Sequence, residues 1–101
     1  MTKAELDYSR SLMAETNSIL AALGSAKIHD AVNWCELACT AVEKVKTFSG
    51  NATSTEWRVL IEEASPEAHE FRTLVAEGLA RRGYSGVAVV TGWLPLAGQP
   101  I

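Results

Sequence analysis

The spacing of apolar residues predicts a long amphipathic helix near the start of the chain. Its apolar positions recur every three or four residues, as one face of a helix requires. They are Tyr8, Leu12, Met13, Ile19, Leu20 and Leu23. Thr2 and Glu5 have the spacing of a capping box, and Gly24 stands where a glycine commonly ends a helix. We therefore expect a helix over residues 3–23.

The next segment also carries apolar residues at helical spacing. One face holds Ile28, Val32, Cys35, Cys39 and Val42, and Ala31, Trp34, Ala38, Ala41 and Val45 widen it. This pattern predicts a second helix over residues 26–46. A turn of about two residues would join the two helices into an antiparallel hairpin over residues 1–47.

The pattern changes after this second segment. Residues 47–55 are rich in Thr and Ser around Gly50-Asn51, and they indicate a loop. Apolar and polar residues then alternate over 56–62, which predicts a strand with Trp57, Val59 and Ile61 on its buried face. A helix beginning at Ser65-Pro66 and ending near Gly83 follows, and residues 87–91 predict a second strand.

Together these elements predict a single α+β domain over residues 1–101, in the order α-α-β-α-β. The helical hairpin would be followed by a β-α-β unit over 56–93, of open strand direction, and by an extended apolar tail over 94–101. Two strands alone make a poor sheet, so a third strand, the helical hairpin or a second copy of the chain would have to complete it. The sequence therefore favours a homo-oligomer with a two- or three-stranded sheet.

Charge and composition narrow the function classes. The net charge is −3, with 9 Lys and Arg against 12 Asp and Glu, which argues against nonspecific binding to nucleic acid. No run of 18 or more apolar residues predicts a membrane span, and the N-terminus lacks the apolar core of a signal peptide. With two cysteines in a small domain, the expected compartment is a reducing cytoplasm.

Candidate chemistry is sparse. Cys35 and Cys39 would share a helical face, but neither His29 nor His69 is placed to complete a metal site with them, so both cysteines are expected to be small core residues. No nucleophile motif, Gly-rich phosphate loop or other catalytic signature occurs. We expect no metal, no cofactor and no catalytic residues.

Two residue sets remain as candidate contact sites. The basic set, Arg72, Arg81 and Arg82 with nearby Tyr84, would contact an anion or an acidic partner, or would only match the helix dipole on a solvated surface. The apolar set would anchor an interface, because tryptophan combines a large contact area with a polar group, or its tryptophans would only pack in the core. It consists of Trp34, Trp57, Trp93, Leu94 and Leu96.

The segment "RRGYSGVAVVTGW" resembles part of small phage-encoded proteins of virion-associated or uncharacterised role. In those proteins a helix ending in Gly-Tyr leads into an alternating strand that ends near a Trp. The matching positions here are Gly83, Tyr84, Val87, Val89 and Trp93. The resemblance implies an oligomeric structural or host-interaction protein without catalytic residues, located in a virion or a host cytoplasm.

Three functions remain open from the sequence. The first is a non-enzymatic homo-oligomeric structural or protein-interaction module, in keeping with a phage structural protein. The second is a small inhibitor or adaptor whose acidic surface binds a basic host protein. The third is a small-ligand binder with a pocket between subunits, lined by Trp57, Arg81, Tyr84 and Trp93.

Overall fold

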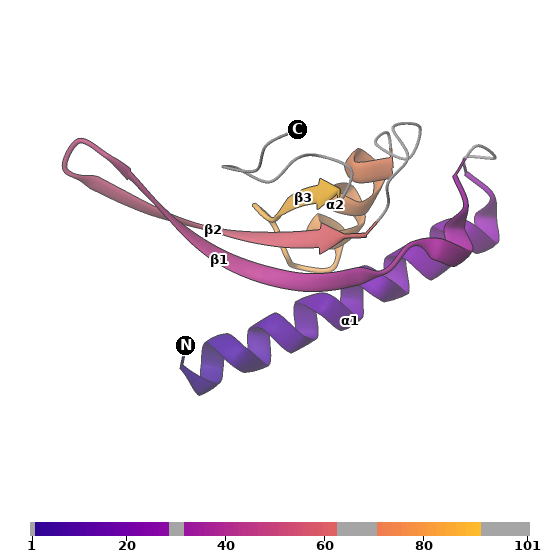
Figure 1. Cartoon of the computed structure of the whole chain (residues 1–101), viewed down its shortest axis with the longest axis horizontal. Helices are drawn as coiled ribbons and strands as arrows, with labels where there is room; N and C mark the ends of the chain where they lie inside the picture. The colour runs from indigo at the N-terminus through magenta and orange to yellow at the C-terminus, as the bar shows by residue number, and fades with distance from the viewer. Residues whose placement is uncertain (1, 29–31, 63–70, 92–101) are drawn as a thin grey trace, which may run out of the picture.

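A computed structural model describes residues 2–28, 32–62 and 71–91 as a two-layer α+β fold (Figure 1). The elements follow the order α1 (Lys3–Ala26), a short 3-10 helix η1 (Trp34–Glu36), β1 (Cys39–Ser49), β2 (Ala52–Ile61), α2 (Phe71–Arg81) and β3 (Ala88–Thr91). The three strands form one mixed sheet in the order β1-β2-β3. β1 and β2 are antiparallel, whereas β2 and β3 are parallel.

The capping box predicted for α1 is present. The Glu5 N–H donates to Thr2 Oγ1 at 3.1 Å, and the Thr2 N–H donates back to Glu5 Oε1 at 3.4 Å. The helix does not end at Gly24, however, but continues to Ala26 and is capped by Lys27 in the left-handed conformation. Gly24 has a packing role instead, because a Cβ there would lie 2.8 Å from Trp34 Cβ.

The predicted order α-α-β-α-β and the helical hairpin over 1–47 are wrong. A helix was expected over 26–46, but most of this segment forms η1 and the first eight residues of β1. A loop was expected over 47–55, but most of this segment belongs to β1 and β2. β1 is rich in β-branched residues, which favour strands, and its partner strand lies directly after a two-residue turn. Gly50, with φ at 60°, opens that turn, and Ser49 pairs with Ala52 across it.

The elements that follow β1 agree with those predicted from the sequence. The strand expected over 56–62 is the inner part of β2, and the strand expected over 87–91 is β3. The described part of the third predicted helix is α2, and its expected start at Ser65-Pro66 lies outside the described residues. The third strand of the sheet is β1, and the tail over 94–101 also lies outside the described residues.

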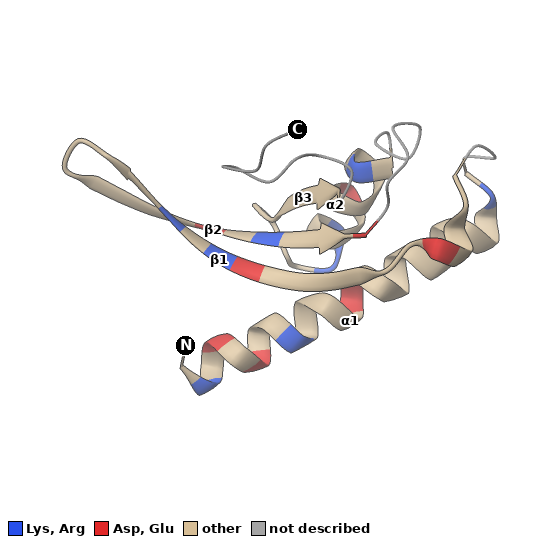
Figure 2. Ribbon diagram, in the orientation of Figure 1, with Lys and Arg blue, Asp and Glu red and all other residues tan. Residues whose placement is uncertain are grey.

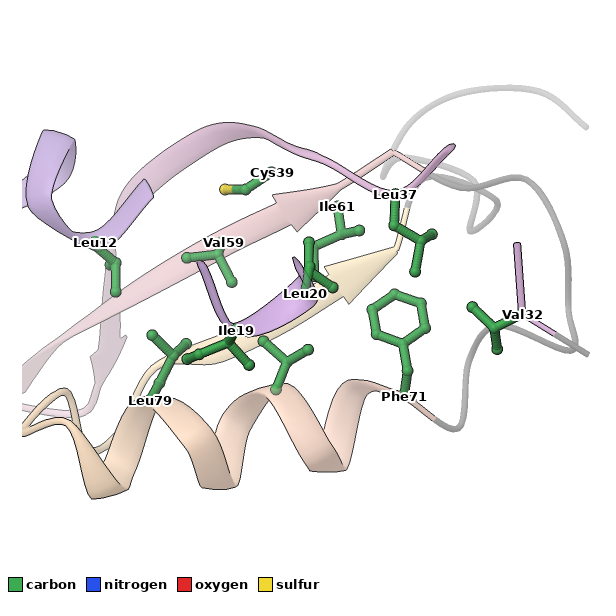
Figure 3. Packing of buried hydrophobic residues seen from close by; sticks show 11 residues of the cluster. Leu12, Ile19, Leu20, Val32, Leu37, Cys39, Val59, Ile61, Phe71 and Leu79 are labelled. Carbon is green, nitrogen blue, oxygen red and sulfur yellow. The ribbon is translucent and has the colours of Figure 1, made fainter. Parts of the chain in front are cut away.

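Both long helices pack on one face of the sheet and form a single core (Figure 3). β2 contributes Val59 and Ile61, which are fully buried, while Trp57 packs at the edge of the core. The buried helix residues are Leu12, Ile19 and Leu20 from α1 and Phe71, Val75 and Leu79 from α2. Gly78 of α2 allows a close approach to α1, because a Cβ there would lie 3.1 Å from Ile19 Cγ2.

The described residues contain no candidate transmembrane helix. None of their helices is both long enough and apolar enough to cross a bilayer. Both helices carry charged residues along their length (Figure 2).

Candidate protein-interaction surface

The β1–β2 hairpin projects beyond the body of the protein (Figure 1). We define the hairpin arm as residues 46–55, which comprise the last four residues of β1, the turn Gly50-Asn51 and the first four residues of β2. Every residue of the arm is exposed. Two-stranded hairpins without a covered face are only marginally stable in water, so a long and fully exposed arm calls for a physical explanation.

β3 and α1 lie beside the hairpin only as far as the base of the arm. β3 pairs with β2 only from Arg58 to Ile61, so no described strand lies beside the arm on that side. On the other side, β1 is an edge strand, and its last described contact with α1 is the ion pair of Lys44 with Glu5. Both edges of the arm are therefore without a strand partner in the part of the chain that the structure describes.

The arm is also chemically distinct from the body. From Thr47 to Thr55 no charged side chain occurs, and the ribbon is uniformly tan around the tip (Figure 2). Phe48 lies within this uncharged stretch and is 73% exposed, the largest exposure among the described large apolar residues. Phe48 shares its sheet face with Val42 and Lys44, but it lies beyond the N-terminus of α1, which would otherwise cover it.

Polar and aromatic contacts fix the base of the arm to α1. Lys44 Nζ lies 2.7 Å from Glu5 Oε2 and 5.8 Å from the centroid of the Trp57 ring. The hydrogen bond from Lys44, with help from Thr2, lowers the pKa of the Glu5 carboxyl from 4.5 to about 2. The arm therefore starts from a defined position, although its tip is uncovered.

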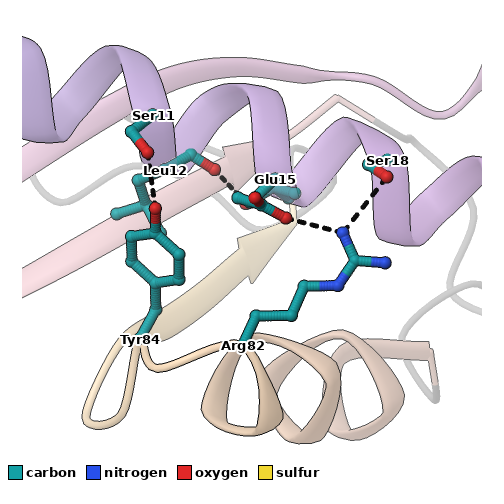
Figure 4. A network of polar contacts seen from close by, with 7 residues as sticks. Ser11, Leu12, Glu15, Ser18, Arg82 and Tyr84 are labelled. Carbon is teal, nitrogen blue, oxygen red and sulfur yellow. Dashed lines mark hydrogen bonds and ion pairs between the residues drawn. The ribbon is translucent and has the colours of Figure 1, made fainter.

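Trp57 and Tyr84, both predicted contact residues, lie close together in the structure. Tyr8 of α1 joins them, with its ring centroid 4.8 Å from that of Trp57 and 5.6 Å from that of Tyr84. The Tyr84 hydroxyl also shares a hydrogen bond with Ser11 Oγ (Figure 4). Partial burial, followed by the proximity of Tyr84, raises the pKa of Tyr8. This aromatic group fastens β2 and the α2–β3 connection to α1, so it acts within the fold.

The predicted basic cluster is divided in the structure. Arg82 donates to Glu15 Oε2 at 2.6 Å and to Ser18 Oγ at 3.1 Å, which ties the end of α2 to α1 (Figure 4). Arg81 faces solvent and lies 3.7 Å from Glu77 on the same helix. Arg72 lies in the first turn of α2, at the opposite end of the helix and about 14 Å from Arg81 along the axis. The three guanidinium groups therefore do not converge on one anion.

The remaining predicted interface residues divide into two groups. Trp34 is half-buried and packs edge-on against Phe71, with ring centroids 6.1 Å apart, so it closes one end of the core. Trp93, Leu94 and Leu96 lie outside the described residues. Of the predicted apolar set, none of the described members lies in the hairpin arm.

Cysteine positions agree only in part with the expectation of two core thiols. Cys39 is buried at the start of β1, and burial raises the pKa of its thiol. Cys35 is exposed in η1, because the helix that was expected to bury it does not form. Among the described residues, no group of three or more Cys, His, Asp or Glu is arranged to hold a metal ion.

Three hollows on the described surface can be compared with the predicted ligand pocket. One of about 90 Å³ lies on the sheet face opposite the helices, beside Glu43, Arg58 and Leu60. Two others, of about 310 and 270 Å³, lie against α1 near Trp34 and between the two helices. None is lined by Trp57 or Tyr84, as the predicted ligand pocket requires.

The arm was not predicted, although the sequence contains a signal for a hairpin turn. Gly50-Asn51 lies between two Thr-rich and Val-rich segments, and a glycine-containing pair between such segments is typical of a tight hairpin. Because residues 47–55 show no apolar alternation, they resembled a loop.

Comparison of the chain with protein-family models, curated proteins and solved structures yields no match. The functional argument therefore rests on the geometry of the described residues, above all on the exposed and uncharged hairpin arm.

Proposed function

We propose that the chain is a non-enzymatic, homo-oligomeric structural or protein-interaction module whose contact element is the hairpin arm. The observation that carries the proposal is the exposure of Phe48 at 73% on a two-stranded arm with no described neighbour. Exposed strand edges are templates for pairing with another chain, and proteins usually protect them with charges. The arm lacks charges from Thr47 onward, as a pairing surface would.

The rigid base of the arm supports the same proposal. Binding is strongest when the contact element is already held in position, because less conformational freedom is lost. Glu5, Lys44 and Trp57 hold the arm at its base, as described above. The arm would thus present Phe48 to a partner in a fixed direction.

The resemblance to small phage-encoded proteins is part of this proposal. Gly83 and Tyr84 form the connection between α2 and β3, and Val89 packs against the core from β3. A projecting hairpin on a small body suits a subunit that must join a larger assembly. On this proposal the protein would act in a virion or in the cytoplasm of a host cell.

The test is the absolute mass in solution, measured by light scattering after gel filtration over a tenfold dilution. We expect the wild-type chain to form a defined oligomer and the Phe48→Ser variant to dissociate. Ile28→Ser is the matched control, because Ile28 is also an exposed apolar residue, at 48%, but lies at the far end of α1. The control variant should keep the mass of the wild-type oligomer.

A wild-type chain that is monomeric at every concentration would overturn the homo-oligomer. Capture of one stoichiometric basic protein from a host lysate by that monomer, abolished by Phe48→Ser, would then favour the adaptor function. An oligomer that Phe48→Ser leaves intact would show that the subunits meet elsewhere.

A further inference from the structure

We infer that the partner of the hairpin arm is the same arm of a second copy, with the two β1 strands antiparallel about a two-fold axis at Thr47. This inference rests on the proposed function and specifies its interface. The pairing would extend over residues 45–49 of each chain, so that Lys46 of one copy lies opposite Phe48 of the other. Two features of β1 determine this register: the part of its edge that is free and the positions of its charged residues.

The inner part of the β1 edge is already occupied. The Cys39 N–H donates to Asn17 Oδ1 of α1 at 2.8 Å, and the pairing with β2 is irregular between Cys39 and Ala41. The ion pair of Lys44 with Glu5 of α1 is a side-chain contact on the helix-facing side of the sheet, so it leaves the backbone edge open. A second strand therefore finds an edge free of described contacts with α1 along the part of β1 that leads into the arm.

Symmetry limits the registers that remain. When two copies of one strand pair antiparallel about a two-fold axis perpendicular to the sheet, both keep the same faces. Side chains alternate between the faces, so only residues an even number of positions apart can lie opposite each other. Each register is then defined by the residue on the axis.

Like charges disfavour four of these registers. A centre at Glu43, Lys44 or Lys46 places that residue opposite its own copy, and a centre at Val45 places Lys44 opposite Lys46. Like charges directly opposite each other destabilise a strand pair. A centre at Val42 avoids them, but it requires the edge at Cys39 that Asn17 occupies.

The register centred on Thr47 remains and has favourable contacts. Lys46 would lie beside Phe48 of the other copy, which is the kind of ammonium–ring contact that Lys44 already makes with Trp57. Val45 would lie opposite Ser49, and Thr47 opposite Thr47, and threonine pairs of this kind stabilise sheets. A centre at Phe48 is also free of like charges, but it pairs Lys46 with Gly50 of the turn and so aligns fewer strand residues.

The pairing would also stabilise the arm. Two arms side by side form a four-stranded sheet, whereas an isolated two-stranded hairpin is marginal. Both bodies, which carry the net charge of −3 per chain, would lie at opposite ends of this sheet. Their mutual repulsion would therefore be weak beyond the screening length of the solution.

The test uses opposite charges at the axis position, measured at low ionic strength with two differently labelled copies. T47K alone and T47E alone would each place like charges opposite each other and weaken the dimer. An equimolar mixture would place Lys opposite Glu and restore it, with a dissociation constant about fivefold or more below that of either variant. T73K and T73E are the control pair, because Thr73 is an exposed residue of α2 in the body of the protein, and both should keep the wild-type affinity.

Three results would overturn this inference. Unchanged affinity of T47K and T47E, together with a loss of affinity in Phe48→Ser, would move the axis away from Thr47 while leaving the proposed function intact. Failure of the mixture to recover would show that the arm binds another surface of the second copy. A wild-type monomer would remove both the interface and the proposed oligomer.

Discussion

Lys44 in β1 donates to Glu5 in the first turn of α1 at 2.7 Å, so the first turn of the helix is joined to the strand at the base of the arm. Glu5 also accepts the Thr2 N–H, which makes one carboxylate both a helix cap and an ion-pair partner. The ion pair requires the ionised carboxylate, and the hydrogen bond from Thr2 is stronger with it.

This arrangement predicts a small loss of stability in acid. The pKa of Glu5 falls from 4.5 to about 2 on folding, so its contribution is complete above pH 4.5 and is lost as the pH falls toward 2. Lys44→Met removes the largest cause of this pKa shift. The difference in unfolding free energy between wild type and variant should therefore shrink over that pH range, as urea unfolding would show. A constant difference would mean that the ion pair does not form in solution.

A second prediction compares the same substitution at two positions of α1. Leu12 is fully buried, whereas Leu6 is 40% exposed. Leu12→Ala should lower the unfolding free energy by about 2–5 kcal/mol, because it leaves a cavity in the core. Leu6→Ala should cost less than about 1 kcal/mol, since most of its effect is the loss of partly exposed surface. Equal costs in urea unfolding would contradict the assignment of the buried face of α1.

A third prediction concerns the two thiols. An aromatic disulfide reagent should modify one cysteine of the folded protein quickly, because Cys35 is exposed and Cys39 is 5% exposed with a raised pKa. Both cysteines should react at similar rates in urea. In Cys35→Ser the fast reaction should vanish, and a persistent fast reaction would show that Cys39 is accessible in the native state.

Local signals in the sequence predicted α1, the inner half of β2, the described part of α2 and β3. Each has either a cap or a clear apolar period, such as the capping box at Thr2 or the alternation of Trp57, Val59 and Ile61. β1 lacks such a period. Its apolar residues serve both faces of the sheet, so Cys39 and Val42 fit a helical face as well as a strand.

What decides the conformation of β1 is its pairing with β2 and not its own apolar pattern. Val42 pairs with Val59 of β2, and only the hairpin turn at Gly50 brings these positions together. The arm was harder still to predict, because within the described chain nothing buries it and burial is what produces periodicity. The arm was not predicted because it is exposed, and this exposure is also what makes it a candidate contact surface.

The parallel pairing of β2 with β3 bears on the order in which the protein forms during synthesis. The β1–β2 hairpin needs only contacts that are close in sequence, whereas β3 pairs with β2 across the whole of α2. Local contacts form quickly, and chains emerge from the ribosome N-terminus first. Both strands of the hairpin therefore leave the ribosome before β3, and on one polysome the arms of neighbouring nascent chains would be free to meet while their C-terminal parts are still being translated.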